Sequence, residues 1–420
     1  MIHQLKKIVS YLPVIGLLLL LCALPFHYGW LQRLSLYIIG ISFPIDYIYN
    51  QRWKSCKWSN QKWVYVIFIC FFLLIPIWQY FDKQTTPTLQ IMINNYVPFL
   101  FFGICGLLGI TDRLRIEYVS MTMLITSVGI IIYTLLSVGF SDFSNFKIWI
   151  KHFNDILHQQ VNTHMVINLY WNLSVIFGFF IIWYSENSKW LKGVVVALLI
   201  PICLALSTTD GRTGLLSFVG VVLIFMLHSM FKHRRWWIFP IMLGFAMCTY
   251  GLFKQNNRLV AATTEINPRV YIWDIAVDMI KERPYLGYGV CSARSEFVEK
   301  GMEDDNFYNK YAKVLIDKLN SKTQNIDLAI MHPHNALLDT WIQFGIMGVL
   351  LLLGCFVLPF TMRIGKYQLP LNLCVFVFAM QSIFESLGSN LQPLYLCLMV
   401  LILHNQFLNT EVPKENPTLL

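Results

Sequence analysis

The sequence predicts an all-α polytopic membrane protein with about twelve transmembrane helices and one large loop that itself contains helices. Three observations support this fold class. Of the 420 residues, 56% are hydrophobic and only 13% are charged, whereas soluble domains carry about 25% charged residues. The mean hydropathy, +0.55, is correspondingly high. Long apolar runs recur along the chain, so soluble and disordered proteins are excluded.

Twelve apolar runs carry few charges and are expected to cross the membrane, since a spanning helix needs roughly 20 apolar residues. They lie at 11–26, 34–49, 63–78, 97–110, 118–138, 165–184, 191–206, 213–230, 236–253, 337–360, 369–384 and 391–407. Residues 1–253 are therefore expected to hold nine spans and residues 335–408 three. A loop at 254–334 separates the two groups, and a cytoplasmic tail follows at 409–420.

The distribution of cations predicts the orientation. With the N-terminus in the cytoplasm, the inside segments carry 16 Lys and Arg residues and the short outside loops carry 5. Cytoplasmic loops carry such an excess, and long loops are largely exempt from the rule. Both chain ends are therefore expected in the cytoplasm and the long loop outside. The net charge of +9 follows from this surplus, so no nucleic-acid partner is expected.

The long loop contains a clear helix signal. Asn267 can cap a helix and Pro268 suits its first position, which puts Arg269 in the first turn. An apolar stripe follows, made of Val270, Trp273, Ile275, Met279 and Ile280. Pro284 ends the helix, Gly287 and Gly289 form a turn, and a second amphipathic stretch is expected at 307–319. The loop carries 11 cations and 11 anions, and a structured loop without chemistry is the open alternative.

The segment before the tenth span contains candidates for chemistry. His334 and the positions that follow it at helical spacing, ending with Gly345 and Gly348, share one helical face. The glycines are expected to let another helix approach beneath the histidine. A histidine titrates near neutrality and can accept a proton from a hydroxyl. The alternative is an interfacial histidine that only caps the helix, and His332 could bind pyrophosphate or act as a cap.

Two arginines on the same side of the membrane complete the set. Arg212 lies in a very short outside turn, where an arginine is costly unless it is paired or used. Arg269 opens the loop helix. Because guanidinium groups stay charged and match phosphate oxygens, these two residues and His334 could form a site for a lipid pyrophosphate. Simple ion pairs with Asp210 and Glu265 are the alternative reading.

Three motifs resemble the bacterial O-antigen ligase family, which is related to O-antigen polymerases and protein O-oligosaccharyltransferases. The first is His334-Asn335, nine residues and then Gly345. The second is the turn from Thr209 to Gly214 around Arg212, with one spacing difference from the family's pattern. The third is an Arg-x-x-x-Trp…Pro-x-x-Gly-x-Gly pattern, formed by Arg269, Trp273, Pro284, Gly287 and Gly289. The resemblance covers about residues 162–348.

The resemblance implies a GT-C-like glycosyltransferase of the bacterial inner membrane with a periplasmic active site. It would transfer a glycan from undecaprenyl pyrophosphate to a sugar hydroxyl of lipid A–core, inverting the anomeric carbon without a metal or other cofactor. His334 would be the general base, and Arg212 and Arg269 would hold the leaving group. Further candidates for contact with substrate are Asn335, His332, Trp273 and Glu385.

Other functions remain open. The same superfamily includes a polymerase that would lengthen the lipid-linked glycan and a protein O-oligosaccharyltransferase that would modify Ser or Thr. A flippase or transporter is a more distant alternative, but such proteins place charges near the middle of the membrane, and these spans hold almost none. No zinc, P-loop or Asp-x-Asp motif occurs in the sequence, so no metal or nucleotide cofactor is expected.

Overall fold

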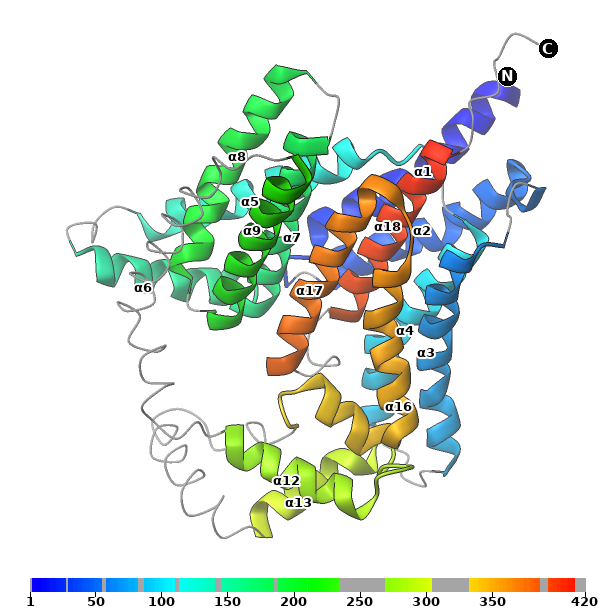
Figure 1. Ribbon diagram of the computed structural model, residues 1–420, viewed down its shortest axis with the longest axis vertical. Coiled ribbons are helices and arrows are strands. Elements are labelled where there is room, and N and C mark those ends of the chain that lie inside the picture. The colour runs from blue at the N-terminus through cyan, green and yellow to red at the C-terminus, as the bar shows by residue number, and fades with distance from the viewer. Residues whose placement is uncertain are drawn as a thin grey trace.

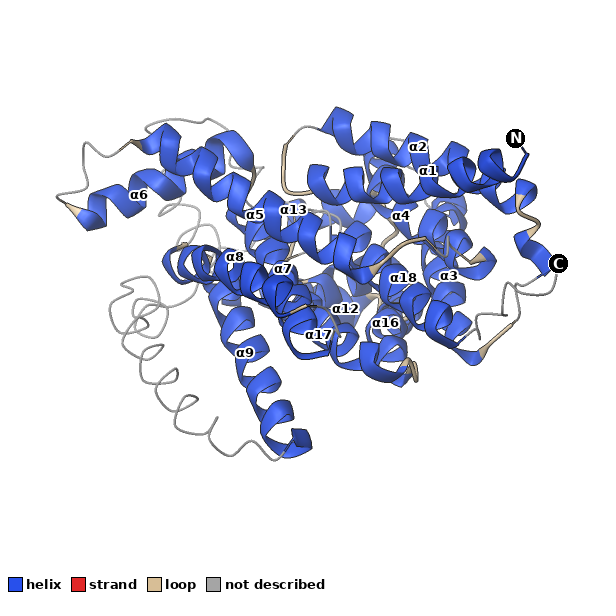
Figure 2. Cartoon of the chain, turned by 90° about the horizontal axis from the view of Figure 1, so that it is seen from above, coloured by secondary structure: helices blue, strands red, loops and turns tan. Residues whose placement is uncertain are grey.

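The computed structural model describes residues 2–27, 29–54, 58–81, 87–109, 113–139, 145–184, 188–209, 211–233, 269–303, 332–385 and 392–411. Throughout these residues the chain forms helices and their connections, with no strand (Figures 1 and 2). Seven of the described helices are long and apolar enough to cross a membrane. The protein is therefore an all-α polytopic membrane protein, as its composition predicts.

The helices are numbered along the chain as in Figure 1. They are α1 (Ile2–Ala23), α2 (Gly29–Tyr49), α3 (Trp63–Phe81), α4 (Pro87–Leu108), α5 (Ile116–Val138), α6 (Phe146–Ile156), α7 (His164–Tyr184), α8 (Lys189–Thr208), α9 (Arg212–His233), α12 (Arg269–Glu282), α13 (Ser292–Glu303), α16 (Ala336–Thr361), α17 (Gln368–Phe384) and α18 (Gln392–Glu411).

Eleven of the twelve predicted spans coincide with these helices, and the ninth, at 236–253, lies outside the described residues. Helix boundaries differ where polar residues lower the hydropathy. Helix α4 begins at Pro87, ten residues before the predicted span, because Asn94 and Asn95 interrupt the apolar run. Helix α18 continues to Glu411, past the predicted start of the tail. The predicted domain boundaries stay predictions.

Two helices form the interior of the bundle. Helix α7 packs against α5, α8, α9 and α17, and its Tyr170 and Trp171 are fully buried. Helix α18 packs against α4 and α17. On the outside, apolar side chains such as Ile41 and Leu136 are 66% and 74% exposed. Such exposure is costly in water, so these surfaces fit contact with lipid tails.

The two loop helices lie together at the end of the bundle opposite the start of α1 (Figure 1). We call this the loop end. The α12 helix and its apolar stripe are confirmed: Ile275 and Met279 are buried in a small separate core that includes Phe297 of α13 and Ile342 of α16. Helix α13 was not predicted, and the predicted amphipathic stretch at 307–319 lies outside the described residues.

Helix α6 is a second element that hydropathy did not predict. It is short and amphipathic, with Phe153 buried and Lys151 exposed, and it continues into one π-helical turn at Leu157–Val161. The indole of Trp149 donates to the carbonyl of Gly139 at 3.0 Å, and the amide of Asn154 donates to the carbonyl of Thr208 at 3.2 Å. These bonds hold α6 against the ends of α5 and α8.

Candidate functional site

His334 lies in a tight turn just before α16. Its backbone has φ 49°, a left-handed conformation that costs a non-glycine residue roughly 1–2 kcal/mol. The next residue, Asn335, caps α16: its side-chain oxygen accepts from the backbone N–H of Leu337 at 2.9 Å and of Leu338 at 3.0 Å. Its amide nitrogen donates to the carbonyl of Ile383 in α17 at 3.1 Å. The turn is therefore fixed to two helices.

The imidazole of His334 faces the end of α17. Its Nδ1 lies 3.6 Å from Oε2 of Glu385, and the two side chains are 29% and 8% exposed. The ring of His332 lies beside it, with 4.2 Å between ring centroids. The Nδ1 of His332 accepts from the backbone N–H of His334 at 3.2 Å. This bond stabilises the turn, whereas the residue that caps α16 is Asn335. A role of His332 in binding pyrophosphate stays a prediction.

Helix α12 is tied to the same turn. The indole of Trp273 donates to the carbonyl of Pro333 at 2.9 Å. Arg269, the first residue of α12, precedes Trp273 by one helical turn, about 6 Å along the axis. The structure therefore brings the backbone of Arg269 near the histidine turn, while the side chain of Arg269 lies outside the described part.

The two glycine motifs meet each other. Helix α16 is broken at Gly345, where φ is 63° and ψ is −158°. The carbonyls freed by this break accept from the loop turn: Tyr288 N–H donates to Ile342 at 2.7 Å, and Gly289 N–H donates to Gln343 at 3.1 Å. A Cβ on Gly345 would lie 2.1 Å from the carbonyl oxygen of Tyr285. The glycine is needed for both its backbone conformation and this close approach.

This contact corrects the expectation for the glycines of α16. The predicted single helical face does not continue past Gly345, because the helix breaks there. The segment that approaches Gly345 is the loop turn and not a helix, and a Cβ on Gly348 would meet Phe344 and Thr340 of the same helix. The start of the predicted face does pack against the loop, since Trp341 donates its indole N–H to the carbonyl of Pro284 at 2.9 Å.

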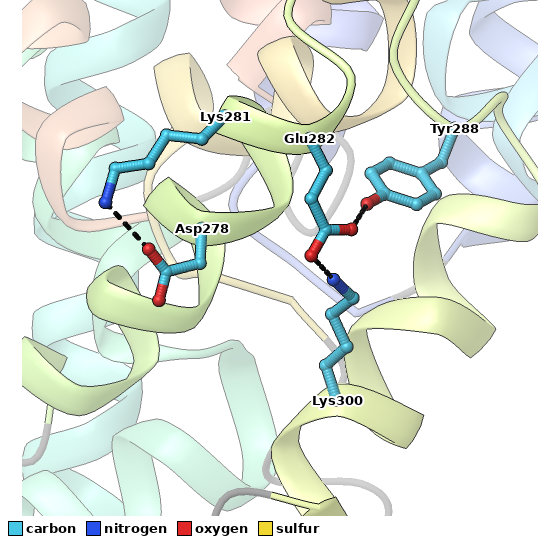
Figure 3. Close-up of polar contacts among 5 residues, drawn as sticks. All are labelled: Asp278, Lys281, Glu282, Tyr288 and Lys300. Atoms are coloured by element: carbon cyan, nitrogen blue, oxygen red, sulfur yellow. Dashed lines mark hydrogen bonds and ion pairs between the residues drawn. The ribbon is translucent and has the colours of Figure 1, made fainter.

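Polar contacts hold the two loop helices and the turn together (Figure 3). The hydroxyl of Tyr288 donates to Glu282 at 2.6 Å, and the ammonium of Lys300 in α13 also binds this carboxylate. Lys300, and then Tyr288, hold the pKa of Glu282 below its usual value. Burial, and then the Glu282 carboxylate, raise the pKa of Tyr288. The network joins α12, α13 and the turn that docks on Gly345.

The arginine turn packs against the start of α7. The hydroxyl of Thr209 donates to the side-chain oxygen of Asn168 at 3.0 Å, and the amide of Asn172 donates to the carbonyl of Gly214 at 3.0 Å. A Cβ on Gly211 would lie 2.1 Å from Nδ2 of Asn168. Arg212 is the first residue of α9, and its side chain lies outside the described part.

A contact between α7 and α17 joins the two regions. The amide of Gln381, one turn before Glu385, donates to the carbonyl of Met165 at 3.1 Å. Met165 in turn precedes Asn168 by about one turn of α7. The histidine turn, the end of α17, the start of α7 and the arginine turn are thus connected along the loop end.

Sequence reasoning missed the asparagines of α7. Asn168 and Asn172 are buried within an otherwise apolar helix. Buried polar residues in a spanning helix are costly and mark packed or functional positions. Their spacing of four residues could have indicated a polar stripe facing another segment. It could not have indicated which segment, because the arginine turn follows about 40 residues later.

The fold and the candidate site define a polytopic membrane protein in which the loop helices dock beside a cluster of polar residues at the ends of the spanning helices. Residues 197–353 match the family model Wzy_C, described as O-antigen ligase. This match, over somewhat less than half of the chain, bears out the family resemblance recognised from the motifs. The matched range includes Arg212, Arg269, Trp273, His334 and Gly345.

Two curated relatives agree with this family. The "Putative polysaccharide ligase" of Rickettsia conorii is 27% identical over 194 residues, which cover 44% of this chain and 42% of the relative. The protein of the same name from Rickettsia prowazekii is 29% identical over 178 residues, which cover 41% and 40%. The matched part of the chain thus spans about two fifths of the length of these relatives.

No group of three or more His, Cys, Asp or Glu side chains that could hold a metal ion occurs among the described residues. The candidate ion pairs of Arg212 with Asp210 and of Arg269 with Glu265 involve side chains outside the described part.

Proposed function

We propose that the protein is an O-antigen ligase of the bacterial inner membrane. It transfers a glycan from undecaprenyl pyrophosphate to a sugar hydroxyl of lipid A–core at the periplasmic face. The observation that carries this proposal is the docking of α12, which begins at Arg269, onto the turn that holds His334, through the bond from Trp273 to Pro333. The family match supports the class of enzyme.

The chemistry requires little from the protein. His334 accepts the proton of the acceptor hydroxyl as its oxygen attacks the anomeric carbon of the glycan. The bond from this carbon to the phosphate oxygen breaks on the opposite face, which inverts the configuration. Arg212 and Arg269 stabilise the charge that develops on the pyrophosphate as it leaves. A general base, cationic groups that bind the pyrophosphate and correct positioning of the two substrates are sufficient for this reaction, because pyrophosphate is already a good leaving group.

The remaining candidates act by holding this arrangement. Both polar atoms of the Asn335 side chain bind within the protein, and the indole of Trp273 binds the backbone next to His334. We therefore assign them to the support of the site, along with His332.

The test is reconstitution of the pure protein in liposomes with lipid-linked glycan and lipid A–core, scored for the joined product. A ligase forms glycan-bearing lipid A–core. A polymerase forms only longer lipid-linked glycan, and a protein O-oligosaccharyltransferase modifies an added periplasmic acceptor protein. Movement of labelled lipid across the vesicle membrane without transfer would support a flippase and contradict the proposal.

A further inference from the structure

The two nitrogens of the His334 ring lie in different surroundings. Nδ1 is fully buried and has no hydrogen bond, whereas the side chain as a whole is 29% exposed. The buried Nδ1 cannot meet a sugar hydroxyl, which leaves Nε2 as the ring nitrogen for that contact.

The group that faces the buried nitrogen is a carboxylate. Oε2 of Glu385 lies 3.6 Å from Nδ1, and the Glu385 side chain is 8% exposed. His332, a second titratable neighbour among the described residues, binds the backbone N–H of His334 with its own Nδ1. Glu385 is thus the acceptor placed to take a proton from Nδ1 of His334 in a hydrogen bond. Such bonds are often long before substrate binds and shorten in the complex.

The backbone enforces this pairing. The left-handed conformation of His334 is a strained one, and strain of this kind persists only where the surroundings fix it. The bond from Asn335 to the carbonyl of Ile383 fixes the histidine turn to α17, two residues before Glu385. Glu385 itself is the extended residue that ends α17. Both side chains are therefore presented from anchored positions.

We propose that Glu385 is a positioning residue for His334. Its carboxylate keeps the proton on Nδ1, so that the unprotonated Nε2 faces the acceptor hydroxyl, and it stabilises the imidazolium that forms when Nε2 takes the proton. This inference rests on the proposed role of His334 as base. It assigns Glu385 to the histidine, which its carboxylate faces at 3.6 Å, rather than to direct contact with the substrate. Carboxylate–histidine pairs are recognised by such geometry and not by sequence position.

The first experiment measures the tautomer without substrate. The protein is labelled with ¹⁵N-histidine, and the signal of His334 is identified by its loss in His334→Ala. At neutral pH the wild type is expected to carry the proton on Nδ1. In Glu385→Met, which keeps the side-chain length and removes the acceptor, the proton is expected to redistribute toward Nε2. An unchanged spectrum in Glu385→Met overturns the inference.

The second experiment is a double-mutant cycle on transfer. Glu385→Met is expected to lower kcat by roughly 10²- to 10³-fold with KM for lipid-linked glycan nearly unchanged. In the His334→Ala background the same substitution is expected to cause no further loss, because the two residues act as a unit. If the loss in the double variant equals the product of the two single losses, or if Glu385→Met changes only KM, Glu385 contacts the substrate independently of His334. Glu299→Gln removes an exposed carboxylate of α13 and serves as the control.

The two experiments separate the failures. If His334→Ala lowers transfer as expected while Glu385→Met changes neither tautomer nor kcat, Glu385 is not a positioning residue and the proposed function stands. If the tautomer responds but neither variant affects transfer, the pairing is real and His334 is not the base. Thermal midpoints of the purified variants verify that each one is folded.

Discussion

At the scale of single residues, His334 combines a strained backbone with the side chain proposed as the general base. Its φ of 49° is a conformation that Asn and Gly adopt more readily than His. Selection for stability alone would favour one of those residues. The presence of a histidine at this strained position is therefore consistent with a role for its imidazole. Hydrogen bonds made by His332 and Asn335 stabilise the turn.

Replacement of His334 is expected to separate stability from activity. His334→Ala and His334→Asn should each lower transfer by at least about 10²-fold, as expected for the loss of a general base. The Asn variant should match or exceed the wild type in thermal midpoint, because Asn tolerates the left-handed backbone. Transfer and thermal midpoint are measured on the same reconstituted preparations. Retained transfer in both variants would remove His334 from the chemistry.

The arginines give a second prediction at this scale. Arg212→Lys and Arg269→Lys keep the charge but lose the paired geometry of the guanidinium group. Each is expected to lower kcat/KM for lipid-linked glycan by about tenfold or more, the equivalent of one charge-assisted hydrogen bond. Arg294→Lys, on the exposed surface of α13, is the control. Wild-type turnover in both lysine variants would indicate structural ion pairs.

At the scale of elements, the sequence predicted what local signals specify. The end of α12 at Glu282 follows from Pro284, and its buried face follows from its apolar spacing, while the predicted cap at Asn267 lies outside the described residues. The break in α16 could not be predicted, because Gly345 lies in an apolar run that hydropathy treats as continuous. The contact of the loop turn with that break joins positions 57 residues apart in the chain, as the bond from Trp341 to Pro284 illustrates. Such pairings depend on the whole fold.

The docking of the loop turn on α16 can be tested by adding one methyl group. Gly345→Ala forces a left-handed alanine and places its Cβ against the carbonyl of Tyr285. Expected are a destabilisation of about 1–3 kcal/mol from the backbone alone and faster hydrogen exchange in α12. Gly365→Ala is the matched control, since Gly365 also has a positive φ but nothing within 4 Å of its Cβ. Equal effects of the two variants on α12 would contradict the docking.

The contacts of Glu282 with Lys300 and Tyr288 predict that the stability of the loop depends on pH. Lys300 and Tyr288 hold the pKa of Glu282 below its usual value. The stabilisation is therefore complete above the ordinary glutamate pKa of about 4.3 and is lost as the pH falls through the lower value in the folded protein. The thermal midpoint of Glu282→Gln should lie below that of the wild type at pH 7, and the difference should shrink in acid. The effect is small, because Glu282 is 53% exposed.

A matched control comes from the other ion pair of the same helix. Asp278 and Lys281 lie one turn apart and are both well exposed, with 2.8 Å between Nζ of Lys281 and Oδ1 of Asp278. Such pairs contribute little to stability, so Asp278→Asn should leave the thermal midpoint unchanged at every pH. A difference between wild type and Glu282→Gln that does not vary with pH would indicate a contact independent of the glutamate charge.

At the scale of the whole molecule, the loop helices α12 and α13 lie at the loop end, away from the start of α1 (Figure 1). The bonds from Trp273, Asn335 and Gln381 connect the histidine turn, the end of α17 and the start of α7 to these helices, while the cation surplus of the sequence lies in segments expected at the opposite end. A site at one membrane face suits two amphiphilic substrates, because each can enter from the lipid with its polar head already at the right depth. The same orientation of the protein in the membrane then accounts for the cation surplus on the cytoplasmic side and for the site on the outer side.

That orientation predicts the labelling of introduced cysteines. Glu299→Cys, on the exposed surface of α13, should react with a membrane-impermeant maleimide in intact spheroplasts, because the loop end is expected outside. Lys54→Cys, exposed after α2, should react only after the membrane is permeabilised. The unsubstituted chain gives the background from its native cysteines.

The alternation of sides requires the run at 236–253 to cross the membrane, so this labelling also tests the count of twelve spans. Reaction of Lys54→Cys in intact spheroplasts, with protection of Glu299→Cys, would put the loop in the cytoplasm. His334 could then not meet an acceptor on the outer side, and the ligase proposal would fail with the orientation.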